Sequence, residues 1–87
     1  MRQLFVTPQF KKDWRDVPAH VRAEADSVTV ALRVNPVDAR LGVKKLQGIV
    51  PAAWRVRIGQ YRLIYSLNKT DVILHRIRLR KDIYRTL

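Results

Sequence analysis

Two adjacent segments with alternating side chains constrain the fold more than any other part of the sequence. Residues 54–59 place apolar and cationic side chains in alternation, which is the period of a half-buried β-strand. Gly59 and Gln60 can supply a tight turn, after which residues 61–67 return as a second strand. The sequence therefore predicts a β-hairpin with one apolar face and one face that carries arginines.

Residues 72–79 follow a short turn and continue the same pattern as a third strand. The residues of one parity on these strands are expected to face the core, with His75 among them as a core histidine: Tyr61, Leu63, Tyr65, Leu67, Ile73, His75, Ile77 and Leu79. The other parity places a set of arginines on the opposite face: Arg55, Arg57, Arg62, Arg76, Arg78 and Arg80. Arg76 lies deeper in its strand than the others, and a structural ion pair is the alternative for it.

The first half of the chain has helical signals. Residues 4–6 predict a short strand, and Thr7 with Pro8 suits the cap and first position of a helix that stops near residue 17. A second helix is expected from Pro18 to Asn35, where apolar residues recur at helical spacing. Residues 36–53 are expected to form a basic connector. The order of elements predicts one α+β domain over residues 1–87, a single twisted sheet with the helices packed on one face.

Composition excludes several classes of protein. Hydrophobic residues make up 47% of the 87 residues, which favours one packed core over disorder. Cysteine is absent, so disulfides and thiolate metal sites are excluded. No apolar run reaches the roughly 18 residues of a membrane span. We expect a cytoplasmic protein that requires no metal and no other cofactor and has no membrane partner.

The net charge of +11 is concentrated in the second half of the chain. Residues 1–39 carry six cationic and five acidic side chains, a net of +1, whereas residues 40–87 carry twelve and two, a net of +10. A surface with one sign of charge repels itself unless an anionic partner relieves the repulsion. Nucleic acid is the leading partner, and an acidic protein is compatible with the same field.

Four segments together resemble the RelE/ParE toxin family, with the RelE-like branch favoured: residues 35–36 (Asn-Pro), 46–48 (Leu-Gln-Gly), 54–65 and 78–84 (Arg-Leu-Arg-Lys-Asp-Ile-Tyr). The resemblance covers nearly the whole chain. It implies a fold like that of small microbial ribonucleases and a role as the toxin of a type II toxin–antitoxin pair. The RelE branch implies cleavage of mRNA in the ribosomal A site, and the ParE branch implies poisoning of DNA gyrase.

The resemblance also implies which residues act. Arginine forks match phosphate oxygens and stay charged, so Arg55, Arg57 and Arg62 would clamp the transition state. Tyr84 would contact the 2′-hydroxyl, although packing of the C-terminus is an alternative for it. Arg78 or Arg80 would orient or neutralise the leaving oxygen. Further RNA contacts are expected from Lys44, Lys45, Arg76 and Lys81, with a solvated loop as the alternative for the two adjacent lysines.

The leading hypothesis is a metal-independent, ribosome-dependent mRNA endoribonuclease that inhibits translation. Its partners would be mRNA, the ribosome and a cognate antitoxin with an acidic or amphipathic segment. A gyrase inhibitor of the ParE type is the alternative. A degenerate, non-catalytic RNA-binding toxin also stays open, because RelE-type enzymes often have lysine at the positions of Arg55 and Arg57.

Overall fold

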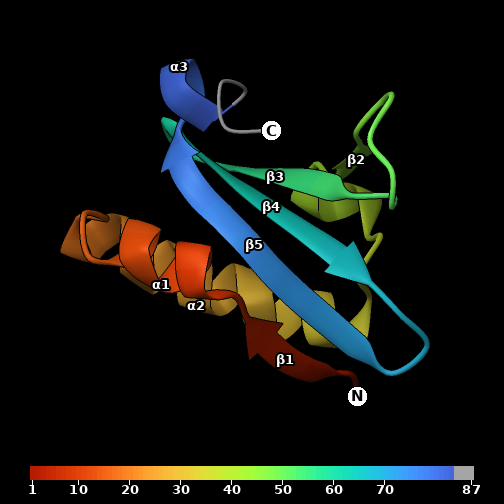
Figure 1. Ribbon diagram of the computed structural model, residues 1–87. Helices are drawn as coiled ribbons and strands as arrows, with labels where there is room; N and C mark the ends of the chain where they lie inside the picture. Colours follow the sequence, from red (N-terminus) through yellow and green to blue (C-terminus); the bar gives the residue numbers. More distant parts are fainter. Residues whose placement is uncertain (84–87) are drawn as a thin grey trace.

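The computed structural model describes residues 1–83. Five strands of this part of the chain form one sheet in the order β1-β5-β4-β3-β2. Helices α1 and α2 lie on one face, and α3 continues from the end of β5 (Figure 1). No helix within residues 1–83 combines the length and the apolar character needed to traverse a bilayer. The elements are β1 (Gln3–Val6), α1 (Pro8–Trp14), α2 (Ala19–Val34), a short 3₁₀ helix η1 (Ala39–Leu41), β2 (Lys44–Lys45), β3 (Trp54–Ile58), β4 (Tyr61–Leu67), β5 (Asp71–Leu79) and α3 (Arg80–Ile83).

The two N-terminal helices begin where the sequence predicts. The Thr7 side-chain oxygen accepts a hydrogen bond from the backbone N–H of Phe10 at 3.1 Å, which caps α1. Phe10 and Trp14 stack with their ring centroids 5.5 Å apart, as their four-residue spacing on one helix face requires. Arg22 of α2 then donates to the carbonyl oxygen of Trp14 at 3.0 Å, so α2 ties down the end of α1.

The sheet has one parallel and three antiparallel pairings. Strand β1 pairs in parallel with β5, and β5, β4, β3 and β2 follow as antiparallel neighbours. The predicted hairpin is confirmed, with Ile58 opposite Tyr61 at its turn. The main core fills the space between this sheet and the two helices, and its buried members are Phe10, Val17, Val21, Ala25, Leu32, Val56, Ile58, Leu63, Tyr65, Val72, Leu74 and Ile77.

The predicted parity of β5 is wrong over its first half. Ile64 pairs with Arg76 whereas Tyr65 pairs with Leu74, so the register shifts at His75. An extra residue in one strand reverses the faces that the following residues occupy. Val72 and Leu74 therefore enter the main core before the shift. His75 is half-buried rather than a core histidine, and its Nε2 atom lies 2.6 Å from the hydroxyl oxygen of Ser66.

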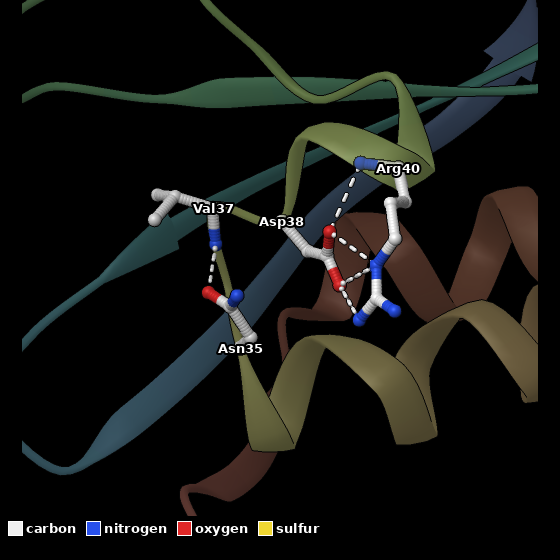
Figure 2. A network of polar contacts seen from close by, with 4 residues as sticks. All are labelled: Asn35, Val37, Asp38 and Arg40. Carbon is white, nitrogen blue, oxygen red and sulfur yellow. Dashed lines mark hydrogen bonds and ion pairs between the residues drawn. The ribbon is translucent and has the colours of Figure 1, made fainter.

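The region between α2 and β3 is not only a connector. Lys44 and Lys45 form a short strand β2 that pairs with β3, so the sheet has one more strand than the sequence predicts. The preceding turn is held by local polar contacts (Figure 2): Asp38 accepts from the backbone N–H and the guanidinium of Arg40, and Asn35 accepts from the N–H of Val37.

A second, smaller apolar cluster is separate from the main core. Ile64 of β4 and Ile83 of α3 are almost fully buried, and they pack with Ala53, Leu46 and Ile49. The sequence predicts that this face of the sheet carries arginines, and the structure adds an apolar cluster to it. Because Ile64 alternates with Leu63 of the main core, this cluster covers part of the face that α1 and α2 leave open.

His75 makes stability depend on pH. Burial lowers its pKa from the ordinary 6.5, so the folded protein favours the neutral ring. The unfolded chain binds the proton more readily, and the free energy of unfolding is therefore expected to fall as pH drops from 7 through 6.5. Thermal unfolding across this range measures the effect, which His75→Gln should remove. In the exposed control His20→Gln the slope should persist; an unchanged slope in both variants would assign it to other groups.

Candidate phosphate-binding site

Three arginines from three different strands form one cross-strand row. Arg57 of β3 lies directly opposite Arg62 of β4, and Arg62 lies directly opposite Arg78 of β5. Side chains that face each other in this way have Cβ atoms about 4.5–5.5 Å apart, and like charges at that separation are destabilising. An anion that binds to the row would relieve this repulsion.

The middle arginine of the row is held in place by backbone acceptors. Arg62 is only 6% exposed, and its Nη1 atom donates to the carbonyl oxygens of Gly59 and Tyr61 at 3.0 and 2.9 Å. Gly59 lies in the hairpin turn, and Tyr61 is the first residue of β4. The turn that orders the two strands therefore also orients this guanidinium. Arg57 is exposed and Arg78 is half-buried, which places a fixed charge between two more accessible ones.

Two more of the predicted arginines lie near the row. Arg55 is two residues before Arg57 on β3 and therefore shares its face. Arg80 is exposed and is the first residue of α3, directly after the end of β5. Its backbone N–H donates to the carbonyl oxygen of Gln60 at 2.8 Å, which brings the start of α3 beside the hairpin turn.

Arg76 is engaged elsewhere, in the ion pair that was the alternative for it. Its Nε atom lies 2.8 Å from a carboxylate oxygen of Asp13 on α1, and this hydrogen bonding raises the pKa of Arg76. The same oxygen accepts from the backbone N–H of Ile77 at 3.1 Å. Asp13 thus caps the edge of β5 beyond the point where β1 ends. No local pattern in the sequence indicates the role of Asp13, because its partner is 63 residues away.

Removal of the Asp13 carboxylate should destabilise the fold without touching the arginine row. The Asp13 side chain is 9% exposed, so Asp13→Ala leaves the Arg76 guanidinium and the backbone N–H of Ile77 without their acceptor and is expected to cost about 1–3 kcal/mol. Urea denaturation measures this cost. A double-mutant cycle with Arg76→Ala should give a coupling on the order of 1 kcal/mol. Asp16→Ala, at an exposed position just after α1, serves as the control and should change stability little; additive effects of the Asp13 and Arg76 substitutions would rule out the coupling.

The remaining predicted site residues have different positions. Lys45 extends over the Trp54 ring, with its Nζ atom 5.8 Å from the ring centroid, and Trp54 stacks on the buried Tyr65. It therefore lies on the face that packs against the helices, away from the arginine row. Lys81 is exposed on α3. Tyr84 lies outside the described residues. Within residues 1–83, no cluster of three or more histidine or acidic side chains could hold a metal ion.

The two ends of the row have different surroundings. Arg78 borders a cavity of about 180 Å³ that is also lined by Asp13, Asp16 and Asp82. At the other end of the row, Arg55 lies two residues before Arg57 on β3 and pairs with Lys44 of β2. Acidic groups therefore gather near β5 and cationic groups continue toward β2. The arrangement can bind a negatively charged group and stabilise additional negative charge on it.

Comparison with known proteins gives consistent matches. Residues 4–84 match the model of the family described as ParE toxin of type II toxin-antitoxin system, parDE. The chain is also 31% identical to Toxin RelE3 of Methanocaldococcus jannaschii over 86 residues, which are 97% of this chain and 96% of that protein.

Solved structures share the fold over most of the chain. The RelB-RelE antitoxin-toxin complex from Methanococcus jannaschii contains a chain with 27% identity and a TM-score of 0.77, over 95% of this chain and 98% of that one. The archaeal RelE-RelB complex from Pyrococcus horikoshii gives 24% identity and a TM-score of 0.78, over 91% and 94% of the two chains, and shows the fold. With a family match across nearly its whole length and a RelE relative above 30% identity, the chain belongs to the RelE/ParE family of type II toxin–antitoxin toxins.

Proposed function

We propose that this toxin is a metal-independent endoribonuclease that cleaves mRNA on the ribosome and so inhibits translation. The observation that carries the proposal is the cross-strand row Arg57–Arg62–Arg78. Its central member is fixed by the hairpin turn, and its outer members are accessible to a ligand. A phosphodiester is an anion whose oxygens such a row of guanidinium groups can bind.

The chemistry needs little beyond positioning and charge. In RNA, the 2′-hydroxyl attacks the adjacent phosphorus in line, and the 5′-oxygen leaves; the products are a 2′,3′-cyclic phosphate and a 5′-hydroxyl. The guanidinium groups would hold the phosphoryl oxygens as negative charge develops on them. They are poor general bases because they stay protonated. By resemblance to the family, Tyr84 would contact the 2′-hydroxyl, and Arg80 would neutralise the leaving oxygen.

A cognate antitoxin is the expected partner that restrains this activity. The related toxins from Methanococcus jannaschii and Pyrococcus horikoshii were solved in complexes of RelE with RelB. The net charge of +11 favours an antitoxin segment rich in acidic residues. We propose that this segment covers the arginine row and excludes RNA from it.

Mapping of mRNA ends on translating ribosomes tests the proposal. Purified toxin should produce cuts within the codon that occupies the A site. The Lys69→Ala variant should cut mRNA as the parent protein does, because Lys69 is an exposed cation in the β4–β5 turn rather than on the row. Intact mRNA in the presence of folded toxin would overturn the proposal.

The match to the ParE family model favours gyrase as the second candidate target. A gyrase poison would leave mRNA intact and trap cleaved DNA–gyrase complexes. A supercoiling assay with purified gyrase therefore separates the two candidates, since the proposed nuclease should leave supercoiling unchanged.

A further inference from the structure

A second pair of cations lies next to the arginine row, toward the β2 edge of the sheet. Lys44 of β2 is directly opposite Arg55 of β3, and Arg55 is two residues from Arg57 on the same strand. Lys44 is exposed and Arg55 is half-buried. Among the described residues, β2 is the edge strand of the sheet, and no further strand lies beyond Lys44.

Ring contacts establish which face this pair occupies. Trp54 stacks on Tyr65 with ring centroids 6.2 Å apart, and the Nζ atom of Lys45 lies over the ring of Trp54. Tyr65 belongs to the main core, so Trp54 and Lys45 are on the face that α1 and α2 cover. Successive residues of a strand point to opposite faces. Lys44 and Arg55 therefore point to the same face as Arg57.

No acidic side chain compensates this pair in the described part of the chain. The ion pairs within residues 1–83 join Arg40 to Asp38 and Arg76 to Asp13, and neither includes Lys44 or Arg55. Two cations directly opposite each other on a sheet are destabilising without a counter-charge. An anion bound between Lys44 and Arg55 would relieve this repulsion.

The spacing between the two cationic clusters suits a strand of nucleic acid. Two residues along β3 advance roughly 6.6–6.8 Å, which is comparable to the step between neighbouring phosphates along a single strand. We propose that Lys44 and Arg55 form a second phosphate subsite, which holds the phosphate adjacent to the scissile one; this assigns Arg55 to the neighbouring phosphate instead of the transition-state clamp that the family resemblance implies for it. This inference rests on the proposed function, and it directs the RNA strand from the row toward β2, away from the acidic end at Asp16 and Asp82.

Neutralisation of single phosphates tests the subsite independently of cleavage. The probe is a short single-stranded RNA, 2′-O-methylated throughout so that it cannot be cut, with one linkage at a time replaced by an uncharged methylphosphonate. Binding is followed by fluorescence anisotropy at low salt. We expect neutralisation of the linkage that occupies the Lys44–Arg55 subsite to weaken wild-type binding about three- to tenfold, as loss of one ionic contact would.

The Lys44→Gln variant should bind the unmodified strand more weakly by the same factor and should lose its sensitivity to that one linkage only. Its log–log salt dependence should also become shallower by about 0.7. Lys69→Gln, in the β4–β5 turn, is the control and should keep the full sensitivity at every linkage. If Lys44→Gln keeps the full sensitivity to every neutral linkage, the subsite is overturned. The proposal of ribosome-dependent cleavage would still stand. Conversely, the expected pattern together with uncut mRNA on ribosomes would sustain the subsite and overturn the nuclease.

Discussion

Substitution of Arg57 by alanine should reduce ribosome-dependent mRNA cleavage about 10²–10³-fold, the range found when one preorganised donor to a developing oxyanion is removed. Arg57 is the exposed end of the arginine row, and its partner across the hairpin is the buried Arg62. Loss of Arg57 takes away charge that would meet the phosphoryl oxygens, whereas the hydrogen bonds of Arg62 to the turn stay in place. The rate of cut-end formation on programmed ribosomes measures the effect.

The folded state gives the control for this prediction. Since Arg57 is exposed, the free energy of unfolding of Arg57→Ala in urea should lie within about 0.5 kcal/mol of that of the parent protein. The Arg57→Lys variant should recover part of the cleavage rate, because lysine restores the charge without the guanidinium fork. Arg62→Ala is a poorer probe, because removal of a 6% exposed side chain would also weaken the hairpin turn. Undiminished cleavage by a folded Arg57→Ala protein would remove the row from the reaction.

Local patterns in the sequence predict most of the fold. The N-terminal cap at Thr7, the apolar stripe of α2 and the hairpin turn at Gly59 each depend on residues close together in the chain, and each appears as expected. Gly59 has φ +59°, in the left-handed region that glycine adopts more readily than other residues do.

The differences arise where distant segments decide the structure. Strand β2 exists because Lys44 and Lys45 find a free edge on β3, and two residues carry no strand periodicity of their own. The register shift at His75 reverses the faces that the residues of β5 occupy. A prediction from strict alternation assumes a strand without a bulge and therefore misses this shift. The second apolar cluster forms only when Ile83 reaches Ile64 across the sheet.

The same distinction applies to the candidate site. Alternation predicts correctly that Arg57, Arg62 and Arg78 share a face, and strand register then aligns them in one row. It gives Arg76 the same assignment, although Asp13 of α1 holds that guanidinium. The sequence does not show that Lys44 and Lys45 form a strand, so their placement on opposite faces follows only from the pairing of β2 with β3, which leaves Lys45 over the Trp54 ring.

Leu32→Ala should cause one of the largest losses of stability in the chain. Leu32 is fully buried at 0% exposure on α2, in the core that supports the helix-facing side of the sheet. Deletion of its branched side chain leaves a cavity and is expected to cost about 2–5 kcal/mol, a large fraction of the stability of a small domain. Urea denaturation gives the cost directly. Val30→Ala on the same helix is the matched control, because Val30 is 58% exposed and its truncation should change stability by less than about 0.5 kcal/mol. Equal losses in the two variants would mean that α2 does not pack on the sheet through the face that contains Leu32.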